Sequence, residues 1–97
     1  MTVGTVVKLL TPMLGEQLHS VGVVFHDYGD GVQIIFTDGG YDGFSKEEQK
    51  SFLLEMGTDP LSACYGFKNV INMERDYEKG LWNHVFRDDK YRAKSQF

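Results

Sequence analysis

Hydrophobic residues alternate with small or polar residues along the first half of the chain in the manner of β-strands. Three stretches carry this pattern: residues 2–10, 21–26 and 32–37. The first is rich in β-branched side chains, and the third places apolar residues at every second position. The second is apolar on nearly both sides, because Val24 stands on the face opposite to Val23 and Phe25. The pattern predicts a strand in each stretch.

Two turns rich in Gly and Asp join these stretches to their neighbours. Residues 27–31, Asp-Tyr-Gly-Asp-Gly, favour a chain reversal because such residues tolerate a positive φ. Asp38-Gly39 is the strongest hairpin signal, and a two-residue loop there would pair Phe36 with Tyr41. A three-residue loop that includes Gly40 would shift the pairing by one residue. Either loop gives three consecutive antiparallel strands.

Capping residues predict a helix directly after the hairpin. Ser45 and Glu48 have the spacing of a capping box, so that a helix should begin at Lys46. Its narrow apolar stripe runs to Met56, and Gly57 is placed for a left-handed cap at the end. We therefore expect one amphipathic surface helix up to that glycine.

The last third of the chain changes to helical spacing. Asn69 is a suitable N-cap, Val70, Met73 and Tyr77 form one stripe, and Gly80 ends it. A further apolar group then recurs at helical spacing: Leu81, Trp82, Val85 and Phe86. These residues predict a second short helix that buries the tryptophan.

The elements together predict a single α+β domain over residues 1–87. It should be a small antiparallel, SH3-like, partly closed β-barrel of three to five strands with two or three short helices, mainly C-terminal. Residues 88–97 lack periodicity and are expected to form a flexible tail. A chain of 97 residues with 41% hydrophobic composition can build one core and no more.

Residues 3–45 resemble the small SH3-like barrels, Tudor modules especially. The likeness lies in strands separated by tight Gly-Asp turns, with Gly22-Val23-Val24-Phe25 and Ile34-Ile35-Phe36-Thr37-Asp38-Gly39. In that family, aromatic side chains at the barrel mouth can cage a methylated Lys or Arg. The resemblance implies a partner-binding cage with walls Tyr28, Tyr41 and Phe44 and charge partners Asp30 and Asp42. The helix directly after Phe44 departs from the family pattern.

Charge is uneven along the chain. The net charge of −4 argues against a general affinity for nucleic acid. Residues 1–65 hold three Lys and nine acids, whereas residues 66–97 hold seven basic and five acidic residues. One stretch is both basic and aromatic, and we expect any nucleic-acid or partner contact of the tail there: Arg87, Lys90, Tyr91, Arg92 and Lys94.

Catalytic and metal motifs are not found in the sequence. The three histidines have no zinc-ligand spacing, the aspartates of the turns lack the pattern of a calcium loop, and the single Cys64 lies in an apolar setting. We expect no catalytic residue, no metal and no cofactor. The lone cysteine and the lack of a signal peptide or an 18-residue apolar run predict a cytoplasmic protein without a membrane span.

These observations favour a non-enzymatic adaptor or regulatory protein that binds another protein. Aromatic residues make up 13% of the chain, and exposed Tyr and Trp are favoured anchors at interfaces. Small acidic proteins of phages and mobile elements that inhibit a host enzyme offer an analogy. Three alternatives stay open: a nucleic-acid-associated SH3-like module that uses the basic tail, a small enzyme of unknown reaction, and a homodimer formed through an edge strand.

Overall fold

Five strands form one antiparallel sheet in the computed structural model, which describes residues 1–11, 16, 19–59 and 70–92. The strands are β1 (Thr5–Leu9), β2 (Val21–Asp27), β3 (Gly31–Phe36), β4 (Tyr41–Ser45) and β5 (Leu53–Thr58). The helices are α1 (Lys46–Phe52), α3 (Val70–Glu78), α4 (Asn83–Phe86) and α5 (Asp89–Arg92). The α+β class and the antiparallel sheet are confirmed.

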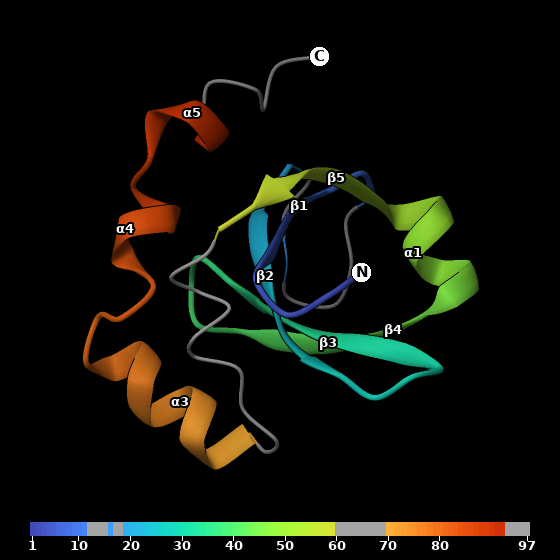
Figure 1. The fold of residues 1–97 in the computed structure, drawn as a ribbon. Coiled ribbons are helices and arrows are strands. Elements are labelled where there is room, and N and C mark those ends of the chain that lie inside the picture. The colour runs from blue at the N-terminus through green and yellow to red at the C-terminus, as the bar shows by residue number, and fades with distance from the viewer. Residues whose placement is uncertain (12–15, 17–18, 60–69, 93–97) are drawn as a thin grey trace.

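The sheet curls but does not close. Its strand order is β4-β3-β2-β1-β5, and no pairing joins β4 to β5 among the described residues. Figure 1 shows β5 and the β3–β4 hairpin on opposite sides of the interior, with α1 between them. The same view places α3, α4 and α5 along the outer side of the sheet. None of the described helices is long and apolar enough to cross a membrane.

Both faces of the central strands are buried, which explains why residues 21–26 are apolar on both sides. The inner face carries the cluster Val7, Leu9, Val24, Val32, Ile34, Phe36, Phe44 and Leu53. The outer face carries Val6, Val21, Val23, Phe25 and Ile35, and α3, α4, α5 and the residue before α4 cover it with Met73, Val85, Phe86, Tyr91 and Trp82. Alternate residues of β2 and β3 therefore contribute to two different hydrophobic clusters.

The β3–β4 hairpin has a three-residue loop, Thr37-Asp38-Gly39. Ile35 pairs with Tyr41, and the Phe36 amide donates to the Gly40 carbonyl at 2.8 Å. The two-residue loop that pairs Phe36 with Tyr41 is therefore wrong. A three-residue loop is found, but it does not include Gly40 as the alternative predicted, because Gly40 lies opposite Phe36 and closes the loop. Gly39 has a φ of +89°, as a bulged three-residue loop requires.

The capping box of α1 is confirmed, but the predicted length of this helix is wrong. The Glu48 amide donates to the Ser45 hydroxyl at 3.1 Å, and the Ser45 amide donates to Glu48 Oε1 at 2.8 Å. The helix ends at Phe52, and Leu53 begins β5, which pairs with β1. The outer edge of β1 takes a backbone partner, and this long-range pairing outweighs the local helical pattern.

Gly57 does not cap a helix. It lies in β5 opposite Val6 with a φ of +147°, close to a register shift in the β1–β5 ladder. In β5, Leu53 is buried and Leu54 is partly exposed, as the two-residue period of a strand requires. Leu53 and Met56 also fit a helical stripe, which is why the sequence predicted a longer helix.

The C-terminal helices form largely as expected, although order extends further along the chain. Gly80, with a φ of +78°, follows α3, and Trp82 is fully buried before α4. We expected a tail from residue 88 onward. Instead, Asp89–Arg92 forms α5, and Tyr91 is only 4% exposed in the outer-face cluster. Residues 93–97 and the predicted N-cap Asn69 lie outside the described residues.

Candidate functional site

Phe44 does not line the predicted aromatic cage. Its side chain is fully buried in the inner-face cluster, with its ring edge against Phe36 at a centroid distance of 6.3 Å. Tyr41 lies three positions earlier in the same strand, so the two side chains point to opposite faces of the sheet. A cage with both rings as walls is therefore not formed.

Tyr28 and Tyr41 are the large aromatic side chains that stay most exposed among the described residues, at 49% and 45%. The Tyr28 hydroxyl lies 3.5 Å from where a Cβ on Gly43 would be. Tyr41 is two residues from Gly43 on the same side of β4, with its ring edge-on to Phe25 at 6.5 Å. We call Tyr28, Gly43 and Tyr41 the tyrosine face. It presents two rings on either side of bare backbone.

The Tyr28 ring also lies close to the backbone of Gly31, at the start of β3. A Cβ on Gly31 would lie 2.6 Å from the Tyr28 hydroxyl oxygen and 2.5 Å from the Phe44 carbonyl oxygen. The ring also lies beside His26, at a centroid distance of 6.0 Å. Because Gly31 has no side chain, the Tyr28 ring packs directly against the backbone of the hairpin. This contact gives the ring a defined position on the surface.

The two predicted charge partners lie in different places. Asp30 is exposed in the same turn as Tyr28. In that turn Asp27 Oδ1 accepts from the Gly29 amide at 3.0 Å. Asp42 lies between Tyr41 and Gly43 in the strand and therefore points to the other face. Only Asp30 can act together with the tyrosine face.

The outer edge of β4 is partly occupied by the chain's own side chains. Asp42 Oδ1 accepts from the Gly43 amide at 2.8 Å, and Glu48 accepts from the Ser45 amide. Amides that are bonded in this way are not free to pair with an added strand. A partner that docks at β4 would therefore contact the side chains of its face rather than extend the sheet.

Glu16 lies against the tip of the β3–β4 hairpin in a cluster of carboxylates. A Cβ on Gly40 would lie 2.5 Å from Glu16 Oε2 and 3.1 Å from Asp38 Oδ1. Burial, a hydrogen bond with Asp38 and the charges of Asp38 and Asp42 raise the pKa of Glu16 to about 7. No sequence pattern marks this cluster, because its members come from separate segments.

This raised pKa predicts a loss of stability between pH 5 and pH 8. The folded chain binds the Glu16 proton more tightly than the unfolded chain, whose pKa is near 4.5, so the contribution is complete below about pH 4.5 and lost as pH rises through about 7. Glu16→Gln should raise the free energy of unfolding at pH 8 by about 1 kcal/mol, allowing for solvent screening. Urea unfolding at both pH values measures this, with Glu47→Gln as control. Equal pH dependence in wild type and Glu16→Gln would contradict it.

The histidines do not assemble a metal site in the described part of the chain. His26 lies beside Tyr28, and His84 Nε2 is 2.5 Å from Asp59 Oδ2. The His84–Asp59 pair links the end of β5 to α4, and its separation of 25 residues gave no sequence signal. Among the described residues, no group of three or more His, Cys, Asp or Glu could hold a metal ion. Cys64 lies outside them.

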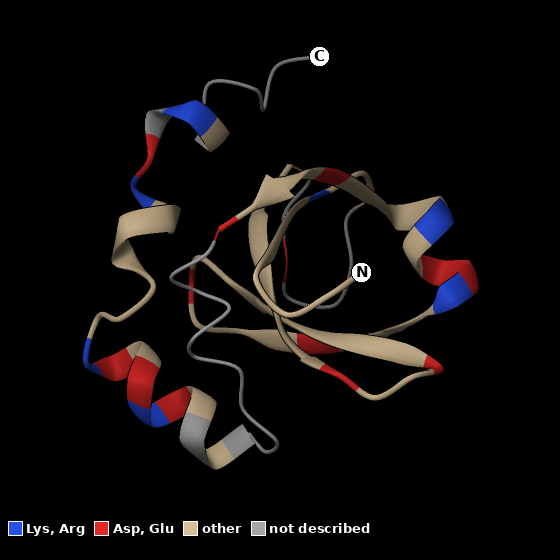
Figure 2. Cartoon of the chain, viewed as in Figure 1, with Lys and Arg blue, Asp and Glu red and all other residues tan. Residues whose placement is uncertain are grey.

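The basic stretch near the C-terminus is divided by the fold. Tyr91 packs into the outer-face cluster, and Lys90 Nζ lies 4.8 Å from the centroid of its ring. Arg87 and Lys90 are exposed, whereas the Arg92 side chain and Lys94 lie outside the described residues. Figure 2 shows basic segments near and within α5 and many acidic segments along α3. The aromatic residue of the predicted contact thus belongs to the core.

The tyrosine face remains the best-defined candidate site. Its rings come from the β2–β3 turn and from β4, and the sheet fixes their relative positions. No protein-family model, no curated protein and no solved structure matches this chain.

Proposed function

We propose that the chain is a non-enzymatic adaptor or regulatory protein that binds another protein through the tyrosine face. The observation that carries this proposal is the pair of half-exposed rings, Tyr28 and Tyr41, on either side of the bare Gly43 backbone. Tyrosine combines a large apolar ring with a polar hydroxyl and has few side-chain torsions to immobilise. It is therefore enriched among the residues that dominate binding energy at interfaces.

The scaffold supports this role because it holds both tyrosines on ordered elements. Tyr41 is in a strand and is braced by Phe25, and Tyr28 rests on the two glycines of the hairpin. The curl of the five-stranded sheet and the tight turns of the β2–β3 and β3–β4 hairpins also support an SH3-like, partly closed barrel, as the resemblance of residues 3–45 implies. We take its recognition surface to be the outer side of β3 and β4, since Phe44 belongs to the interior.

The nucleic-acid alternative is less well supported. Its aromatic residue, Tyr91, is buried and cannot stack on a base without leaving the core. The net charge of −4 also opposes binding to phosphates. A regulatory role by contact with a protein, such as blocking the surface of an enzyme, requires neither feature.

Affinity capture from a lysate of the native host tests the proposal. The tagged wild-type chain should retain a partner that mass spectrometry identifies, and Tyr28→Ala/Tyr41→Ala should weaken that complex at least about tenfold, as expected for the loss of two aromatic anchors. Ile71→Ala is the matched control, because Ile71 is an apolar side chain on α3 that is 76% exposed. Circular dichroism confirms that each variant is folded. A partner held equally by the double variant and lost by Ile71→Ala would refute the tyrosine face.

A further inference from the structure

A hollow of about 610 Å³ opens between the β2–β3 turn, α1 and β5. Its volume lies in the range of sites that hold small molecules. Val32 and Leu53 line it, and both are buried members of the inner-face cluster. Gly29 and Gly31 contribute backbone without side chains from the turn. The hollow thus combines apolar side chains with glycine backbone.

Charged side chains of both signs line the same hollow. Lys46 and Lys50 stand one helical turn apart on α1, so they lie on the same side of the helix. Asp27 comes from the end of β2 and Glu55 from β5. The ion pairs found among the described residues, Arg75–Asp76 and His84–Asp59, lie elsewhere. Two ammonium and two carboxylate groups therefore surround the hollow without neutralising one another in ion pairs.

We propose that this hollow binds a free α-amino acid with an apolar side chain. The ligand's carboxylate would meet Lys46 and Lys50, and its ammonium group would meet Asp27 and Glu55. Its side chain would cover Val32 and Leu53. A ligand with one charge would satisfy only one pair of side chains, whereas a zwitterion satisfies both. This site adjoins the tyrosine face at the β2–β3 turn but uses other side chains, and it does not depend on the proposed function.

Titration of the ¹⁵N-labelled chain with L-leucine, followed by heteronuclear NMR, tests the proposal. We expect saturable shifts of the amides of Gly29, Gly31 and Lys50, with a dissociation constant of about 1 mM. Two analogues test the two charged groups of leucine separately: 4-methylpentanoate lacks the ammonium group, and 3-methylbutylamine lacks the carboxylate. Each should bind at least about tenfold more weakly, because one set of charge-assisted hydrogen bonds is missing.

Charge variants assign the contacts. The double variant Lys46→Gln/Lys50→Gln should weaken leucine binding about tenfold, and Glu55→Gln should weaken it severalfold. The control is Lys79→Gln, because Lys79 is exposed and follows α3, away from the hollow; it should leave binding unchanged. The proposal would be overturned if no saturable shifts appeared at roughly 50 mM leucine, about fifty times the expected dissociation constant. Equal binding of leucine and both analogues would overturn it as well.

Discussion

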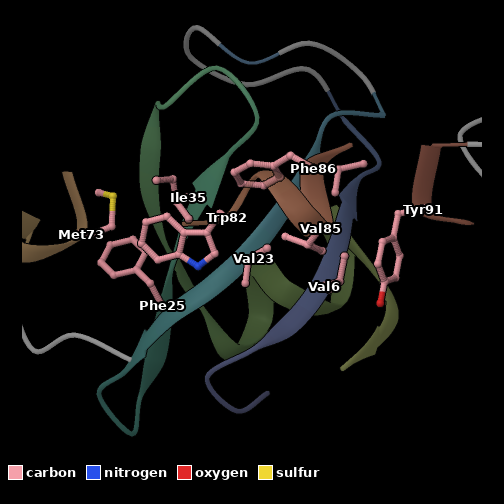
Figure 3. Packing of buried hydrophobic residues seen from close by; sticks show 10 residues of the cluster. Val6, Val23, Phe25, Ile35, Met73, Trp82, Val85, Phe86 and Tyr91 are labelled. Atoms are coloured by element: carbon pink, nitrogen blue, oxygen red, sulfur yellow. The ribbon is translucent and has the colours of Figure 1, made fainter. Parts of the chain in front are cut away.

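Trp82→Ala is expected to lower the free energy of unfolding by about 3–5 kcal/mol, the usual cost of removing a large buried aromatic side chain. Trp82 is fully buried between the outer face of the sheet and the C-terminal helices. Figure 3 shows its indole among Phe25, Ile35 and Val23. The substitution should open a cavity at the point where the two halves of the domain meet.

Urea unfolding followed by far-ultraviolet circular dichroism measures this loss, because Trp82 is the single tryptophan and its fluorescence disappears with it. Trp82→Phe keeps an aromatic ring and should lose less than the alanine variant. Ile71→Ala, at a side chain that is largely exposed, should change stability by no more than about 0.5 kcal/mol. A cost below about 1 kcal/mol for Trp82→Ala would mean that the helices and the sheet do not share a core.

Local signals in the sequence predicted the elements that depend on neighbouring residues. The capping box fixed the start of α1, because both of its hydrogen bonds are made within four residues. Alternation predicted β2 and β3, since a two-residue period places Val32, Ile34 and Phe36 on one side. The buried position of Trp82 followed from helical spacing in the same way.

Features that depend on distant partners could not be predicted. Leu53 and Met56 fit a helical stripe, and only the open edge of β1, more than forty residues earlier, turns that segment into β5. Tyr91 was assigned to a tail because residues 88–97 lack periodicity, and its contact with the outer-face cluster joins it to distant residues of the sheet. The turn residues alone did not determine the register of the β3–β4 hairpin, which pairs Ile35 with Tyr41 and leaves Gly40 outside the loop.

For the candidate site too, the features that depend on neighbouring residues could be predicted and those that depend on distant partners could not. The resemblance to SH3-like barrels implied Tyr28 and Tyr41 as walls of a binding cage, and the structure leaves both side chains exposed. Phe44 was grouped with them, although it is three positions from Tyr41 in β4 and its side chain therefore points to the inner face. The sequence could not show this, because the face on which each side chain lies depends on the register of the strand. The carboxylate cluster of Glu16 and the His84–Asp59 pair join segments that carry no common motif.

Phe44→Ala should therefore behave as a core substitution and cost about 3–5 kcal/mol of unfolding free energy. The Phe44 ring packs against Phe36 in the inner-face cluster, and its backbone carbonyl accepts from Gln49 Nε2 at 3.1 Å. Removal of the ring leaves a cavity beneath α1. Tyr41→Ala removes a half-exposed ring from the same strand and should cost only about 1 kcal/mol, mainly its contact with Phe25.

The pair of variants separates a structural ring from a recognition ring. Partner affinity measured at a temperature where both variants are folded should fall for Tyr41→Ala and stay near the wild-type value for Phe44→Ala. Phe44→Leu should recover much of the lost stability, because a second apolar side chain refills part of the space. If Phe44→Ala were as stable as Tyr41→Ala and also lost the partner, Phe44 would have to face a ligand, and the burial on which the tyrosine face was defined would be wrong.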